Sequence, residues 1–269
     1  MTKIIIIGIT HIDSESHKKV TSFLKDIKPD AVCLELDEYR LEILLENEQQ
    51  INGNLEFKNE SENKDDSKDE EEQLTFPSLI EDIGFFENYL AEMIHTEQPG
   101  KEMLVAYSIA KELGAEIYLI DRSLKDLSET MEEELSSDEA SKFQDLIDDL
   151  LFDKNIIASP TERKEETHTN NSSVNLEDLE KKEEINLNDI LEVFKDEESL
   201  SNILNIFSKN FPMLYSILLE DRNDYMIQRI DEIAPNHNIV VVILGFGHVS
   251  DVAKGLKEIN EQYQIEILK

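Results

Sequence analysis

The sequence predicts an α/β fold whose central sheet is mixed but largely parallel, with about five or more strands flanked by helices. Short apolar runs rich in β-branched residues predict the strands, and they alternate with longer segments of helical periodicity. The predicted strands are residues 3–7, 31–36, 115–120, 239–244 and 264–268. A chain of 269 residues can bury a large core without disulfides or metal, so we expect one domain over residues 1–269.

The first predicted strand, Lys3 to Ile7, is almost entirely isoleucine, which is typical of a strand buried on both faces. Apolar residues three or four positions apart then predict helices in the first half of the chain. These helices are residues 13–27, 38–45, 76–95 and 101–113. Pro99-Gly100 precedes the last of them, and Gly114 follows as its expected C-terminal cap.

The same periodicity predicts helices in the second half at residues 123–152, 185–208, 212–234 and 248–263. Pro212 is placed to open one of these helices, and Pro235-Asn236 to stop it. We expect the central helices to form a helical cap beside the sheet.

Two acidic segments interrupt the globular pattern. Residues 46–73 hold eleven acids, three lysines and very few apolar residues, and residues 159–184 hold eight acids among Ser, Thr and Asn. Such compositions cannot offset the entropy of ordering by burial, so we expect a disordered insertion and a flexible loop.

Composition excludes several classes of function. With 61 acids against 26 bases, the net charge is −35, which argues against nucleic-acid binding and against docking on anionic membranes. No apolar run is long enough for a signal peptide or a membrane span. Cys33 is the only cysteine and has apolar neighbours, so we expect a buried, inert thiol and a cytoplasmic protein.

Two similar motifs follow predicted strands near the two ends of the chain. Gly8-Ile9-Thr10-His11 follows the first strand, and Gly245-Phe246-Gly247-His248 follows the strand at 239–244. The carboxyl ends of parallel strands form the ligand crevice of an open α/β sheet, and glycines let the backbone turn and approach a ligand. Both histidines therefore lie where a ligand would bind, although helix-capping or packing histidines are an alternative.

The second strand ends in Glu35 and Asp37, which strand alternation would place on one face with Cys33. Glu35 is flanked by leucines, and a buried carboxylate needs a partner, a proton or a metal. Together with His11 and His248 it could hold a divalent cation such as Mn²⁺, Co²⁺ or Zn²⁺. A structural pair of Glu35 with an arginine is the alternative.

Arginine is scarce in this chain, and three of its five arginines, Arg40, Arg122 and Arg222, closely follow acids. A retained arginine suggests planar, bidentate pairing. Arg122 follows Asp121 at a strand end, where it could hold a substrate carboxylate or stabilise an oxyanion, or form a structural ion pair.

The motifs GITH, CLELDEYR, PGKEMLVAYSIAKELGAEIYLIDR, EDRNDYM and VVVILGFGHV, spread over residues 4–250, resemble the TraB family. That family includes pheromone-shutdown proteins and is related to the Tiki metalloproteases, and the wider superfamily includes erythromycin esterases and haem-binding lipoproteins. The resemblance implies an α/β core whose two GxxH motifs and an acidic residue line one site.

By this resemblance, His11, Glu35 and His248 take the central, metal-binding positions. Glu102 falls in the PGxEM motif, Arg122 in the DR motif and Arg222 in an ER-like motif. The chain departs from the family at Asp221, where Glu is usual, and at Asp251, where Gly is frequent. Many relatives carry membrane helices after this region, so we expect a soluble member that consists of this domain alone.

These observations favour a metal-dependent hydrolase that cleaves peptides. The expected catalytic residues are Glu35, Asp37, Glu102, Arg122 and Arg222, with substrate-binding residues Arg40, Asp121, Gly8, Gly245 and Gly247. Which of Glu35 and Asp37 is the ligand and which is the base stays open.

The alternatives are a protein that sequesters a peptide without cutting it, a haem- or metal-binding protein, and a metal-free esterase with His11 as general base. A homodimer is compatible with the sequence, which does not give the oligomeric state.

Overall fold

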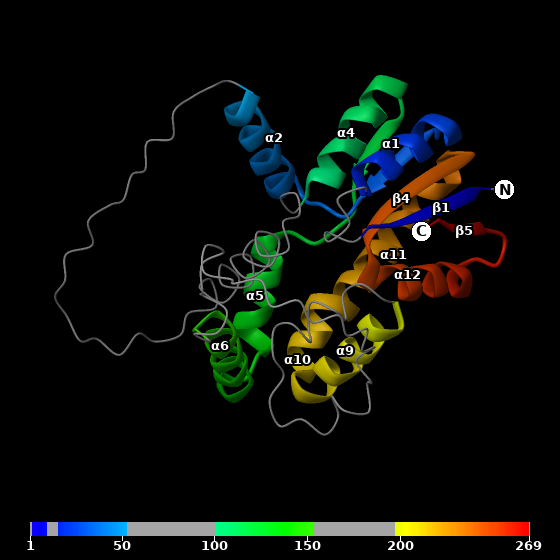
Figure 1. Cartoon of the computed structure of the whole chain (residues 1–269). Helices are drawn as coiled ribbons and strands as arrows, with labels where there is room; N and C mark the ends of the chain where they lie inside the picture. Colours follow the sequence, from blue (N-terminus) through cyan, green and yellow to red (C-terminus); the bar gives the residue numbers. More distant parts are fainter. Residues whose placement is uncertain (1, 10–15, 53–99, 153–196, 269) are drawn as a thin grey trace, which may run out of the picture.

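The computed structural model describes residues 2–9, 16–52, 100–152 and 197–268. Within these ranges, five strands form a single sheet in the order β3-β2-β4-β1-β5, and every neighbouring pair is parallel. Figure 1 shows β4, β1 and β5 side by side. The strands are β1 (Lys3–Ile9), β2 (Ala31–Leu34), β3 (Glu116–Leu119), β4 (Ile239–Gly245) and β5 (Gln264–Leu268). The predicted α/β class is confirmed, and the described sheet is parallel throughout.

Isoleucine and valine runs give the central strands two apolar faces. Ile4 and Ile6 of β1 join one buried cluster, whereas Ile5 and Ile7 join the other. Successive side chains of a strand point to opposite faces of the sheet, so a continuous β-branched run fits a strand covered by helices on both sides. Cys33 is fully buried here, and burial raises the pKa of its thiol to about 12. This agrees with the predicted inert cysteine.

Helices cover both faces of the sheet. On one face lie α1 (Ser16–Ile27) and α4 (Lys101–Leu113), with α2 (Glu38–Asn52) beside α4 (Figure 1). The other face packs against α11 (Asp221–Ile233) and α12 (Phe246–Ile259).

This arrangement creates a topological switch between two neighbouring strands. The chain leaves β1 for α1 on one face and leaves the adjacent β4 for α12 on the other. In open parallel sheets such a switch opens a crevice at the carboxyl ends of the strands.

A helical cap with its own small core lies beside the sheet. It comprises α5 (Leu124–Glu134), α6 (Ser137–Phe152), α9 (Glu197–Asn210) and α10 (Pro212–Tyr215), grouped together in Figure 1. Leu127, Met131 and Leu214 are buried in this core. Glu139 joins α6 to α10, because its Oε1 accepts the backbone N–H groups of Met213 and Leu214 at 2.9 and 2.8 Å. The predicted cap is therefore present.

The segment predicted as one helix over residues 212–234 has an irregular centre. A π-turn (Ser216–Glu220) separates α10 from α11, and a 3₁₀ turn (Ala234–Asn236) follows α11. A π-turn widens the helix locally and is frequent near functional sites. Here it lies directly before Arg222 and Asn223.

Several predicted bounds differ from the structure. The strand expected over 31–36 ends at Leu34, and the helix expected over 123–152 breaks at residues 135–136, where Leu135 is extended. Helix α12 begins at Phe246, before the predicted start, and ends at Ile259. Helix α2 continues to Asn52, so residues 46–52 of the expected disordered insertion are helical. The helix predicted at 76–95 and the loop at 159–184 lie outside the described residues.

None of the helices in the described ranges has the length and apolar character that are needed to cross a bilayer. Among the buried residues of the described part, three are acidic: Asp37, Glu102 and Asp121.

Candidate functional site

Several of the predicted site residues meet at the carboxyl ends of β2, β3 and β4. Glu35 directly follows β2, Asp121 follows β3 and His248 lies in the first turn of α12, just after β4. The first turn of α11 brings Arg222 and Asn223 to the same place. This edge of the sheet includes the switch between β1 and β4.

Glu35 contacts three neighbouring residues of the site. Its Oε2 accepts the backbone N–H of Gly245 at 2.6 Å, and its Oε1 accepts from Arg222 Nη2 at 2.7 Å. The same Oε1 lies 3.2 Å from His248 Nε2. Glu35 therefore has the arginine partner that was the alternative to a metal, and it also contacts one of the two predicted histidine ligands.

The glycines of the two motifs serve different purposes. A Cβ on Gly245 would lie 3.3 Å from Glu35 Oε2, so glycine allows the close approach of this carboxylate to the backbone. A Cβ on Gly8 would lie 3.1 Å from Val249 and 3.2 Å from Phe246. Glycine at position 8 therefore lets β1 and α12 pack closely. On Gly247 the nearest atoms would be leucine carbons at 3.8 Å or more, an ordinary distance.

His248 is held between an acid and an amide. It is 5% exposed, and its Nδ1 lies 2.7 Å from Oδ1 of Asn223, which is also buried. Burial lowers the pKa of His248 below its usual value of 6.5, and the charge of Glu35 opposes this only in part. Sequence reasoning missed Asn223, although it follows Arg222 within the EDRNDYM motif.

Two arginines hold Asp121, which has a fully buried side chain. Arg222 donates to it from both Nε (3.0 Å) and Nη2 (2.6 Å), and Arg40 Nη2 lies 2.9 Å away. Burial alone would raise the pKa of Asp121, but Arg222 and Arg40 outweigh this effect and lower the pKa to about 2. Arg222 also donates from Nη1 to Leu218 O, so every nitrogen of its guanidinium is engaged within the protein.

Asp37 does not share a face with Glu35, because β2 ends before both residues and alternation stops there. Its Oδ1 accepts the backbone N–H of Arg40 in the first turn of α2, and its Oδ2 accepts that of Leu124. Asp37 therefore caps α2 and ties it to α5. It is connected to Glu35 only indirectly, through Arg40, Asp121 and Arg222.

Arg122 turns toward the helical cap. Its Nη2 donates to Thr130 Oγ1 at 2.8 Å, and its Nη1 lies 3.8 Å from Asp221 Oδ2, a long contact. Its side chain is 20% exposed, against 15% for Arg222, whose nitrogens are all engaged. Glu102 is buried in the first turn of α4, on the opposite face of the sheet from α11 and α12.

His11 lies outside the described residues. The strand that precedes it ends at Ile9, which pairs with Gly245 in the register of β1 and β4. Among the residues that the structure describes, no cluster of three His, Cys, Asp or Glu side chains could hold a metal ion. The described part of the expected ligand set is the pair Glu35 and His248.

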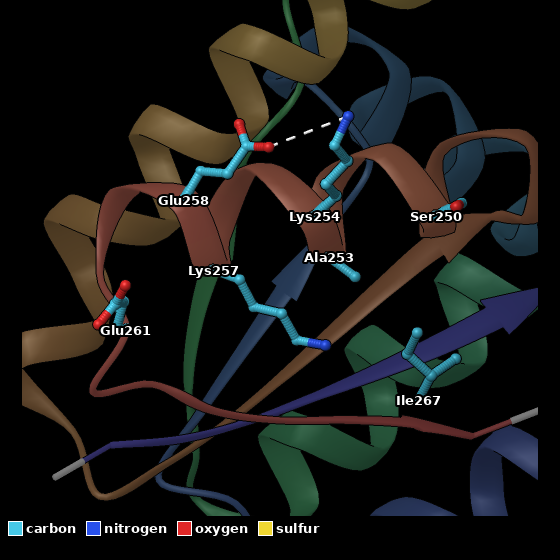
Figure 2. Close-up of a pocket in the computed structure, with 7 residues that line it drawn as sticks. All are labelled: Ser250, Ala253, Lys254, Lys257, Glu258, Glu261 and Ile267. Atoms are coloured by element: carbon cyan, nitrogen blue, oxygen red, sulfur yellow. Dashed lines mark ion pairs between the residues drawn. The ribbon is translucent and has the colours of Figure 1, made fainter.

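A pocket of about 460 Å³ lies elsewhere, between α12 and β5 (Figure 2). It is lined by Ala253 and Lys257 of α12 and Ile267 of β5, among others, and includes none of the predicted site residues. Lys254, also in its wall, pairs with Glu258 at 3.9 Å (Figure 2).

Comparison with known proteins agrees with the resemblance drawn from the motifs. An uncharacterized protein of Methanocaldococcus jannaschii, MJ1365, is 24% identical over 277 aligned positions. The alignment covers 99% of this chain but 56% of that protein, so the chain spans little more than half the length of this curated relative. The model of the TraB/PrgY/gumN family matches residues 1–266. The chain therefore belongs to the TraB/PrgY/gumN family.

Proposed function

We propose that this chain is a metal-dependent hydrolase that cleaves peptide bonds at the carboxyl ends of β2 and β4. One observation carries the proposal: Nε2 of the buried His248 and Oε1 of Glu35 lie 3.2 Å apart at the strand ends of the topological switch. Buried His–carboxylate pairs with perturbed proton affinity, located at such strand ends, are typical of catalytic and metal sites.

The two described groups fit one divalent cation. Two ligands that each lie about 2.1 Å from a metal are separated by roughly 3.0–3.4 Å, and the observed separation of 3.2 Å falls in this range. Imidazole nitrogen with carboxylate oxygen is a donor set that suits Zn²⁺, Co²⁺ and Mn²⁺. His11 would be the third ligand, because the strand before it ends beside Gly245.

A divalent cation at this position would lower the pKa of a bound water molecule and polarise a substrate carbonyl. Other groups of the protein fix the positions of the site residues. Arg222 and the Gly245 N–H fix the Glu35 carboxylate, and Asp121 in turn fixes Arg222. Because Asp37 caps α2, Glu35 is the better candidate for the ligand.

Arg122 is the best candidate to contact the substrate. Unlike Arg222, it has a long, partly exposed ion pair that a substrate could replace, with Asp221 Oδ2 at 3.8 Å. Its guanidinium could then bind a substrate carboxylate or steady a developing oxyanion.

The proposal is tested by assaying peptide hydrolysis by the purified full chain with Mn²⁺, Co²⁺ or Zn²⁺. We expect His248→Gln and Glu35→Gln to reduce activity at least about 100-fold, on the scale at which a lost catalytic group acts. His237→Gln is the matched histidine control, since His237 lies before the amino end of β4 and contacts Tyr118 instead. Equal activity in the wild type and the three variants would reject the proposal that this chain is an enzyme.

The ion pair between Glu35 and Arg222 favours a second candidate, a protein that binds a peptide without cleaving it. A carboxylate that is already paired with arginine is a weaker ligand for a metal ion. Calorimetric titration with peptide in the presence of a chelator, followed by recovery of the peptide, distinguishes the two. Metal-independent affinity with intact peptide supports sequestration. A visible spectrum after addition of haem checks the haem-binding alternative.

A further inference from the structure

The first turn of α11 supplies two consecutive residues to the site, and they act on different partners. Arg222 reaches Glu35 and Asp121 at the ends of β2 and β3. Asn223 instead reaches His248 on α12, with 2.7 Å between Asn223 Oδ1 and His248 Nδ1. Both Asn223 and His248 are 5% exposed, so this contact is shielded from water.

The atoms in this contact determine where the imidazole proton lies. An amide oxygen can only accept a hydrogen bond, so the Nδ1 that faces Asn223 Oδ1 must carry the hydrogen. In a neutral imidazole one nitrogen is protonated and the other carries a lone pair. In the neutral form of His248, Nε2 therefore presents its lone pair toward Glu35 Oε1, 3.2 Å away.

Two electron-rich atoms facing each other in a buried site are unfavourable unless a positive group lies between them. Arg222 binds the Glu35 carboxylate at Oε1, and the Gly245 N–H binds it at Oε2. The orientation of His248 is thus the one that a cation ligand requires. Histidines that bind metals commonly donate their other N–H to a neighbouring acceptor, which fixes the tautomer.

We propose that Asn223 is a positioning residue that holds His248 in the Nδ1–H tautomer, so that Nε2 is free to bind a cation. The assignment of a cation to Nε2 rests on the proposed function, whereas the assignment of the tautomer does not. Asn223 touches neither substrate nor metal, and acts only through the imidazole.

The tautomer is measured directly by nitrogen NMR of histidine-labelled protein without metal, at about pH 8, where a histidine of ordinary pKa is neutral. The His248 signal is assigned by its loss in His248→Gln. We expect the wild-type spectrum to show a protonated Nδ1 and a bare Nε2. A protonated Nε2 in the wild type would overturn the inference.

Two variants and a control distinguish a positioning role of Asn223 from a role in packing alone. Asn223→Leu is close in size but cannot accept the hydrogen bond, so we expect it to shift the proton toward Nε2, where Glu35 accepts it. Asn223→Asp keeps the acceptor and should retain the Nδ1–H form. Asn210→Leu, at an exposed amide at the end of α9, should leave the His248 signals unchanged. An unchanged tautomer in folded Asn223→Leu would also overturn the proposal.

Binding of Zn²⁺, measured by calorimetry, gives the second readout. We expect Asn223→Leu to bind Zn²⁺ about 10- to 100-fold more weakly than the wild type, and Asn223→Asp to restore most of the affinity. Equal affinity of wild type and Asn223→Leu would overturn the positioning role. If the wild type binds no Zn²⁺, Mn²⁺ or Co²⁺, the proposed function fails, and the tautomer measurement still decides the role of Asn223.

Discussion

Arg222 Nη2 lies 2.7 Å from Glu35 Oε1 although the two residues are 187 positions apart in the chain. The same nitrogen lies 2.6 Å from Asp121 Oδ2. One guanidinium from the start of α11 therefore joins carboxylates that follow two neighbouring strands, β2 and β3. The same side chain therefore contributes both to the packing of α11 against the sheet and to the positions of the carboxylates in the site.

Arg222→Lys should destabilise the protein, because lysine is a point charge that cannot reach both carboxylates in the planar, forked manner of arginine. The fully buried Asp121 side chain would lose part of its pairing. We expect a loss of about 1–3 kcal/mol in the free energy of unfolding, measured by urea denaturation. Arg229→Lys, in the same helix but in a surface pair with Glu232, should change it by less than about 0.5 kcal/mol. Equal effects of the two substitutions would contradict a structural role for Arg222.

Gly245→Ala and Gly247→Ala should have opposite effects, although both lie at the start of α12. A Cβ on Gly245 would meet Glu35 Oε2 at 3.3 Å and disturb the buried hydrogen bond to this carboxylate. We expect that substitution to cost about 1–3 kcal/mol. Gly247 is helical with only ordinary contacts nearby, so alanine there should be neutral or stabilise by about 0.5–1 kcal/mol. Thermal unfolding of the two variants measures the difference, and similar shifts would argue against the close approach of Glu35.

Asp121 should contribute a stability that disappears in acid. The pKa of this carboxyl is lowered from 3.8 to about 2 in the folded protein, so folding favours its ionised form. Its contribution to the free energy of unfolding is roughly 2 kcal/mol. This contribution is complete above about pH 4 and is lost as the pH falls through about 2. We expect the difference in unfolding free energy between wild type and Asp121→Asn to shrink over this range. Asp145→Asn, at an exposed position of α6, should show no such change. A difference that is constant with pH would contradict the lowered pKa.

Metal removal should lower the melting temperature if the cation is held as proposed. A ligand at a hundredfold excess over its dissociation constant stabilises the folded state by about 2.7 kcal/mol. We therefore expect Zn²⁺ or Mn²⁺ to raise the melting temperature of the wild type and of His237→Gln, and EDTA to reverse the shift. His248→Gln should not respond. A response of His248→Gln equal to that of the wild type would place the cation elsewhere.

Much of the fold could be predicted from the sequence because local signals are strong where strands are buried on both faces. The isoleucine run of β1 and the run Ile239–Leu244 specify central strands without any tertiary information. Gly100 and Gly114, both with positive φ, mark the two ends of α4 as the sequence predicted. The break at Leu135 also has a local signal, which the prediction of one helix over residues 123–152 overlooked: Ser136 Oγ accepts the Glu139 N–H at 3.2 Å, as an N-cap serine does. The π-turn before Arg222 has no comparable signal.

Some of the residues that meet at the strand ends, such as Glu35 and His248, were named from the sequence, but their partners were not. The chain itself determined that His248 follows a buried strand after a glycine turn and that Glu35 follows another, because strand ends and turns are encoded locally. Only the tertiary structure decided that Glu35 binds Arg222, that Asp37 ties α2 to α5 through Leu124, and that Asn223 faces His248. These contacts join segments 25 to 187 residues apart. Short-range periodicity gives the face on which a side chain lies, whereas the packing of α11 against the strand ends determines which side chain it meets.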